Sequence, residues 1–134
     1  MADTNTPVQM SLFDVPGTPV KSELWGMIEE YYDDRKLKVP DLIDSVLWMV
    51  SEVGEVAEAC VQAQGGWVRN TPGKDRIITP MEIGRELSDV ILMAMRVGMA
   101  MGIDPLIMMA EKMQAKTGKT YVVRCMPLER EEGR

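Results

Sequence analysis

Helix start and stop signals divide most of this chain into four segments, and they constrain its fold more than any other feature. Thr79-Pro80-Met81-Glu82 combines a capping box with proline at the first helical position, which is a clear helix start. Asp41 and Asp104 can act as N-caps in the same way. Apolar residues then recur at helical spacing. The pattern predicts helices over residues 22–36, 41–64, 80–101 and 105–116.

No segment alternates polar and apolar residues at the period of a β-strand, apart from a brief run at 120–123. The predicted fold class is therefore all-α, a four-helix bundle-like arrangement with one core, because 134 residues are too few for two. We expect residues 1–20, which contain three prolines, to form a flexible tail. Residues 122–134 read as a charged second tail, which leaves residues 21–121 as the helical domain.

Composition excludes several classes of function. The chain has no histidine, so histidine-based zinc sites and Ser-His-Asp or Cys-His catalysis are impossible. The net charge of −6 argues against a surface that coats nucleic acid. Cys60 falls on an apolar helical stripe and is expected to be a buried, reduced thiol, and the two cysteines, Cys60 and Cys125, form no metal-binding cluster. Charges interrupt every apolar stretch, and we expect a cytoplasmic protein without a membrane span.

Two acidic pairs stand out on the predicted helices. Glu52 and Glu55 are three residues apart on one helix, and Glu86 and Asp89 repeat that spacing on another. At about 100° per residue, each pair lies beside the apolar stripe of its helix. If the two helices pack antiparallel, the pairs converge, and four carboxylates in one place need a counter-charge. Mg²⁺ or Mn²⁺, which prefer oxygen ligands, are the natural partners.

The alternative is that these carboxylates form solvated helix faces, as most helical glutamates do. Two neighbouring glutamates do have simpler explanations. Glu82 belongs to the capping box, and Glu58 points further around its helix, toward solvent. Methionine clusters at 93–101 and 108–113 favour an adaptable core or a subunit interface over a cofactor site.

The acidic pairs, in the segments SEVGEVAEA and RELSDVILMAMRVGMAMGID, resemble the hallmark of MazG-like nucleoside triphosphate pyrophosphohydrolases. That superfamily carries E-x-x-E, a loop and then E-x-x-D, and the resemblance covers roughly residues 22–121. It implies an all-α MazG-type catalytic domain, completed as a homodimer or homotetramer. It also implies that Glu52, Glu55, Glu86 and Asp89 bind Mg²⁺, with Glu52 and Glu55 as catalytic residues and Glu55 as the general base. The implied reaction converts a nucleoside triphosphate and water to the monophosphate and pyrophosphate.

The resemblance extends to a cationic series near the end of the fourth helix. Lys112 and Lys119 match phosphate-binding cations, Lys116 stands where the family carries asparagine, and Tyr121 follows closely. Met93 stands where many relatives have an aromatic residue, so Trp48 or Trp67 would have to stack on the base instead. The loop between the two motifs offers three further cations that could close over phosphates, namely Arg69, Lys74 and Arg76. Dipole complementarity at a helix end and surface solubility explain these cations equally well.

The N-terminal tail contains 9-QMSLF-13, which resembles the pentapeptide that binds the bacterial sliding clamp. In that interpretation Leu12 and Phe13 anchor in an apolar pocket and Gln9 fixes the orientation. The segment could instead fold back on the helical domain. Two other functions therefore stay open beside the leading one: a non-catalytic helical interaction module or clamp-binding adaptor, and pyrophosphohydrolysis of the histidine-pathway intermediate phosphoribosyl-ATP.

Overall fold

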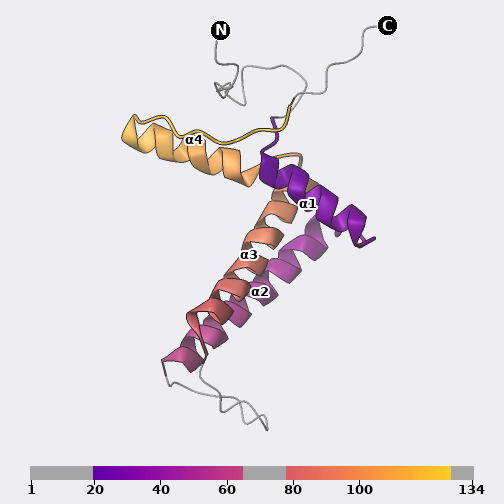
Figure 1. Cartoon of the computed structure of the whole chain (residues 1–134), viewed down its shortest axis with the longest axis vertical. Coiled ribbons are helices and arrows are strands. Elements are labelled where there is room, and N and C mark those ends of the chain that lie inside the picture. Colours follow the sequence, from indigo (N-terminus) through magenta and orange to yellow (C-terminus); the bar gives the residue numbers. More distant parts are fainter. Residues whose placement is uncertain (1–19, 65–77, 128–134) are drawn as a thin grey trace, which may run out of the picture. The chain divides into compact units, whose positions relative to one another are not determined.

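The computed structural model describes residues 20–64 and 78–127, which form four α-helices and no β-strand (Figure 1). α1 spans Glu23–Asp34, α2 spans Leu42–Ala63, α3 spans Pro80–Ala100 and α4 spans Pro105–Thr117. The prediction of an all-α protein is confirmed, and the ends of each helix lie within two residues of those expected. Among the described residues no single helix is long and apolar enough to cross a membrane, although α3 and α4 taken as a pair pass that test.

The helices begin and end at the predicted signals because side chains satisfy their free backbone groups. The Asp41 carboxylate accepts a hydrogen bond from the backbone N–H of Asp44 at 2.8 Å. At the start of α3, the Thr79 N–H donates to the Glu82 carboxylate at 2.8 Å, while the Glu82 N–H donates to the Thr79 hydroxyl at 3.3 Å. This is the reciprocal pairing of a capping box. α4 ends at Gly118, whose φ of 69° lies in the left-handed region that glycine tolerates.

The chain divides into two compact units, which are described separately. The first unit comprises Met1–Val39 with Gly98–Arg134, and it contains α1 and α4. The second unit is the continuous segment Pro40–Val97, which contains α2 and most of α3.

In the first unit, the chain that follows α4 returns to the beginning of α1. Ser22 and Cys125 form an isolated antiparallel bridge, with backbone hydrogen bonds of 2.8 Å on both sides of it. Burial, and to a smaller extent the nearby acids Asp104 and Glu23, raise the pKa of the Cys125 thiol. The buried apolar side chains of α1 and α4 are Trp25, Ile28, Tyr32, Ile107 and Ala110.

Asp104 joins the N-termini of the two helices in the first unit. Its side chain is 1% exposed. One carboxylate oxygen accepts from the Leu106 N–H at 2.9 Å, which caps α4. The other accepts from the Ser22 N–H at 2.7 Å, and Ser22 is itself the N-cap of α1. A single buried carboxylate therefore satisfies backbone donors at the starts of two helices that lie far apart in sequence.

Gly98, in the last turn of α3, has no room for a side chain. A Cβ there would lie 2.5 Å from the carbonyl oxygen of Ile103 and 2.5 Å from the ring of Pro105. We expect Gly98→Ala to lower the free energy of unfolding by about 1–3 kcal/mol through overpacking. Helix propensity alone would raise it by about 1 kcal/mol. Urea unfolding measures whether the free energy of unfolding of this variant falls or rises. An unchanged or increased value would show that the chain after α3 does not pass this close to the helix.

The second unit is a hairpin in which α2 and α3 run antiparallel, side by side (Figure 1). Each helix has only one neighbour in the hairpin, so only one side of each is covered. In α2 the buried residue is Ser45. The expectation that Cys60 is buried is wrong, because Cys60 is exposed. Val53, two turns earlier on the same side of α2, is 51% exposed.

Candidate metal centre

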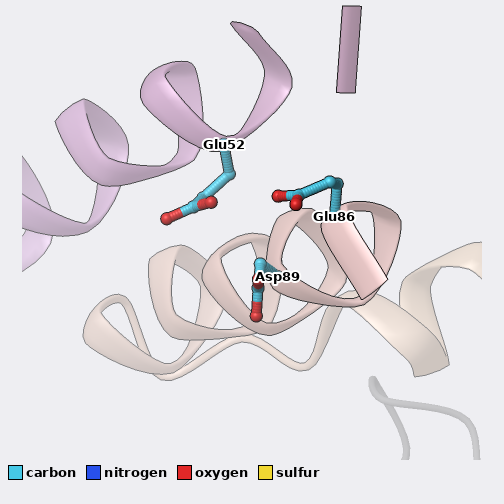
Figure 2. Close-up of side chains that lie close together, drawn as sticks. All are labelled: Glu52, Glu86 and Asp89. Atoms are coloured by element: carbon cyan, nitrogen blue, oxygen red, sulfur yellow. The ribbon is translucent and has the colours of Figure 1, made fainter. Parts of the chain in front are cut away.

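Three carboxylates from the two helices of the hairpin meet at one place. One oxygen of each of Glu52, Glu86 and Asp89 lies within 4.8 Å of the other two. Figure 2 shows Glu52 reaching from α2 toward Glu86 on α3, with Asp89 one turn further along α3. Residues three apart on a helix are side-chain neighbours, so each acidic pair leaves its helix in a similar direction. Antiparallel packing of α2 on α3 then brings the two pairs together.

Glu55 lies at the edge of this group. Its carboxyl group is close enough to those of Glu52 and Glu86 to share a side-chain hydrogen bond with each. The structure therefore brings all four acids of the paired motif together, but it groups only three of them at the spacing of metal ligands.

Burial, together with the crowding of like charges, raises the pKa of two partly exposed acids, Glu52 and Glu86. Burial raises the pKa of Glu52, and the negative charges of Glu55 and Asp89 raise it further. Burial also raises the pKa of Glu86, together with its hydrogen bond to Glu55 and the charge of that residue. Both causes disfavour the ionised form, and a bound cation would remove the repulsive part.

The three-carboxylate group fits a hard divalent cation. Mg²⁺ holds its oxygen ligands about 2.1 Å from the metal, so the three oxygens would have to move closer together than the 4.8 Å within which they now lie. Glu52 and Glu86 are partly exposed and Asp89 is exposed, so their side chains can make that adjustment. Carboxylate oxygens without nitrogen or sulfur ligands favour Mg²⁺ or Mn²⁺ over softer metals.

The raised pKa values predict how stability depends on pH. In the metal-free chain the folded state keeps protons on Glu52 and Glu86 at pH values just above 4.5, the ordinary value, where the unfolded chain has lost them. The contribution of these two protons to the free energy of unfolding is therefore fully present at low pH. It is lost as pH rises through the raised pKa values. Metal binding needs the ionised carboxylates and has the opposite dependence.

We therefore expect Mg²⁺ to raise Tm more at about pH 7.5 than at about pH 5. Thermal unfolding with Mg²⁺ and with EDTA at both pH values measures this difference. A Mg²⁺ effect that is equal at both pH values, or that is larger at low pH, would contradict a site built from these acids.

An open cleft of about 390 Å³ adjoins the acidic cluster within the hairpin. Glu55 and Glu86 line it together with Gln62 and Arg85, which the sequence did not single out as site residues. Helical spacing could have indicated both, because Gln62 lies two turns after Glu55 and Arg85 lies one turn before Asp89. The remaining lining residues are Glu58, Ala59, Ile78 and Glu82.

The sequence predicts the surroundings of one of these acids, Glu82, correctly and those of another, Glu58, incorrectly. Glu82 is committed to its capping box, as predicted. The prediction that Glu58 points to solvent is wrong, because Glu58 is only partly exposed and one of its carboxylate oxygens is buried beside the cleft. The packing of α2 against α3 covers a wider arc of α2 on this side than the apolar stripe indicates.

The other predicted site residues fall into three groups. Trp48 lies one turn before Glu52 on α2 and is 58% exposed, whereas Met93, one turn after Asp89, is buried. Lys112, Lys116 and Lys119 are exposed on the first unit. Near them the Thr117 hydroxyl donates to the Tyr121 hydroxyl at 3.2 Å. The predicted residues that lie outside the described part of the chain are Gln9, Leu12, Phe13, Trp67, Arg69, Lys74 and Arg76.

Comparisons with protein-family models, with curated proteins and with solved structures found no match to this chain. The function therefore has to be inferred from the chain's own residues and their geometry.

Proposed function

We propose that this protein is a Mg²⁺-dependent nucleoside triphosphate pyrophosphohydrolase of the MazG-like type, which acts in the cytoplasm to clean the nucleotide pool. The observation that carries the proposal is the convergence of Glu52 with Glu86 and Asp89 within 4.8 Å. The two halves of the motif lie on different helices, and the fold places them together. An acidic pair on only one of the two helices would not indicate a metal site.

Different carboxylates are proposed to bind the cation and to accept the proton during hydrolysis. Glu52, Glu86 and Asp89 would hold the cation, since their oxygens are the three within ligand spacing. A bound divalent cation supplies positive charge for the triphosphate and lowers the pKa of a water molecule. Glu55 lies beside these three but outside their group, so it is the carboxylate left to accept a proton. The water oxygen forms a bond to phosphorus, the bond to the bridging oxygen breaks, and pyrophosphate and the monophosphate separate.

Substrate contacts are proposed for residues around the cluster. The exposed ring of Trp48, one turn from Glu52, offers a surface on which a base can stack. Arg85 brings a guanidinium group into the adjoining cleft, where it can hold phosphate oxygens. The resemblance to the MazG-like pattern separately implies phosphate-binding roles for Lys112, Lys116 and Lys119, with Tyr121 close by in the sequence.

A screen of nucleoside triphosphates tests the proposal. The full chain is incubated with each common and damaged (d)NTP, and with phosphoribosyl-ATP, in Mg²⁺ or Mn²⁺, and the products are separated. We expect monophosphate and pyrophosphate in equal amounts from at least one (d)NTP, and no turnover in EDTA. Turnover of phosphoribosyl-ATP alone would assign the chain to the histidine-pathway reaction.

Absence of product from every compound would favour a non-catalytic helical interaction module. The segment Gln9–Phe13 would then be the first part of the chain to test, as a sliding-clamp ligand. That motif is a prediction of the sequence alone, because its residues lie outside the described structure.

A further inference from the structure

The cleft beside the acidic cluster is polar, which distinguishes it from an ordinary site for a nucleobase. Eight described residues line its volume of about 390 Å³, and only Ala59 and Ile78 among them are apolar. Pockets that bind small organic molecules are lined predominantly by hydrophobic and aromatic side chains. Trp48, the exposed aromatic residue one turn before Glu52, is not among the lining residues. The lining therefore favours a charged ligand over an aromatic ring.

The cleft and Trp48 lie on opposite sides of the acidic cluster along the hairpin. On α2, Trp48 precedes Glu52 by four residues, whereas Gln62 follows it by ten. At about 1.5 Å per residue, these steps are about 6 Å in one direction and about 15 Å in the other. On α3, which runs the opposite way, Arg85 precedes Asp89 and so lies toward the same end as Gln62. A nucleotide that stacks on Trp48 with one phosphate at the cluster would extend its other phosphates into the cleft.

Among the eight described residues that line the cleft, two carry side-chain N–H donors, and they come from opposite helices. Arg85 on α3 has a guanidinium group, whose planar donors match the oxygens of a phosphate. Gln62 on α2 adds an amide group. The other polar lining residues are glutamates, namely Glu55, Glu58, Glu82 and Glu86. Their negative charge repels a free anion, so a phosphate chain enters this cleft only together with a divalent cation.

We propose that the cleft holds the β- and γ-phosphates of the substrate, with Arg85 as the residue that contacts them, so that the protein selects nucleotides by the length of their phosphate chain. The inference rests on the proposed function, because it assumes that the α-phosphate lies at the acidic cluster. The water oxygen bonds to the α-phosphorus, its proton passes to Glu55, and the bond to the bridging oxygen breaks. The pyrophosphate that leaves is then already in the cleft.

This arrangement predicts which substrates the site distinguishes. A nucleoside diphosphate reaches the cleft with only one phosphate and loses part of the contact with Arg85. The base lies outside the cleft in every case, so its identity has little influence on that contact. The site should therefore discriminate between triphosphates and diphosphates more strongly than between bases.

Arg85→Met tests the inference, because methionine approaches the length of arginine but has no charge. Steady-state rates are measured in Mg²⁺ for a (d)NTP that the chain hydrolyses and for its diphosphate. We expect wild type to prefer the triphosphate at least about tenfold in kcat/KM, and Arg85→Met to reduce that preference about tenfold. Arg85→Lys, which keeps the charge but not the paired donors, should lie between the two. Arg35→Met, at an exposed arginine of the other unit, is the matched control.

Binding of pyrophosphate gives a second readout, which needs no turnover. Calorimetric titration of the full wild-type chain with pyrophosphate should show saturable binding in Mg²⁺ and none in EDTA. Arg85→Met should raise the Kd about tenfold or more. Arg85 is exposed, so we expect that variant to keep the helix content of wild type by circular dichroism. If it does not, Gln62→Leu on the opposite helix takes its place.

The outcomes separate this inference from the proposed function. If Arg85→Met keeps both the preference for the triphosphate and the wild-type Kd for pyrophosphate, the inference is overturned and the proposed function stands. A changed ranking of bases at a constant number of phosphates would also overturn it, since the base would then occupy the cleft. Without turnover of any nucleotide the proposed function fails. The cleft then stands as a phosphate site only if Arg85→Met weakens the binding of pyrophosphate, and it falls otherwise.

Discussion

Glu52→Gln should reduce the rate of pyrophosphate release by about 100-fold or more, which corresponds to about 2.7 kcal/mol of lost transition-state stabilisation. Glutamine has nearly the same shape as glutamate but no negative charge, so it weakens the cation site without creating a cavity. The change also removes one of the crowded negative charges around Glu86 and Asp89. The metal-free variant should therefore be at least as stable as wild type at neutral pH.

These two effects move in opposite directions, which distinguishes loss of a functional site from loss of structure. Activity is followed as pyrophosphate release, and stability as Tm in EDTA and in Mg²⁺. Glu30→Gln, at an exposed glutamate of α1 in the other unit, is the control and should leave both unchanged. A Glu52→Gln protein with wild-type activity would remove Glu52 from the site, and a marked drop of Tm in EDTA would show that its carboxylate is structural.

Asp104→Ala should lower the free energy of unfolding by about 2–4 kcal/mol. Loss of a helix N-cap costs about 1 kcal/mol. The buried N–H of Ser22 also loses its acceptor, which adds about 1–3 kcal/mol. Asp41→Ala removes the cap of α2, but Asp41 is exposed and water can replace its oxygen, so we expect a loss of only about 1 kcal/mol there.

Urea unfolding of the two variants side by side measures the difference between a cap that acts within one helix and one that joins two. Asp104→Asn keeps an oxygen acceptor and should recover part of the loss. Equal destabilisation by Asp104→Ala and Asp41→Ala would show that the contact between Asp104 and the start of α1 adds nothing to stability.

The sequence predicts the ends of the helices because the signals that mark them are local. Capping residues act on backbone groups two or three positions away, so Asp41, Thr79 and Glu82 reveal the helix ends without knowledge of the rest of the structure. The acidic pairs can be predicted for the same reason, because a spacing of three residues places both side chains on the same side of the helix. Their convergence needed only one assumption, that α2 and α3 pack antiparallel.

Features that depend on long-range packing were not predictable from the sequence. The hydrogen bond from Ser22 to Asp104 joins residues 82 positions apart, and no local pattern indicates it. Periodicity shows which residues are apolar but not how many neighbours a helix has. For that reason Val53 and Cys60 are exposed although their stripe is apolar, and Glu58 is partly buried although it is charged.

Titration of the full chain with Mn²⁺, followed by the electron paramagnetic resonance signal of the free ion, measures directly whether the two acidic pairs form one cation site. We expect saturable binding to the wild-type chain and competition by Mg²⁺. Glu86→Gln, on α3, and Glu52→Gln, on α2, should each weaken that binding about tenfold or more, because both helices contribute ligands to the same ion. Wild-type affinity for Mn²⁺ in both variants would contradict this, because it would show that α2 and α3 do not share one cation site.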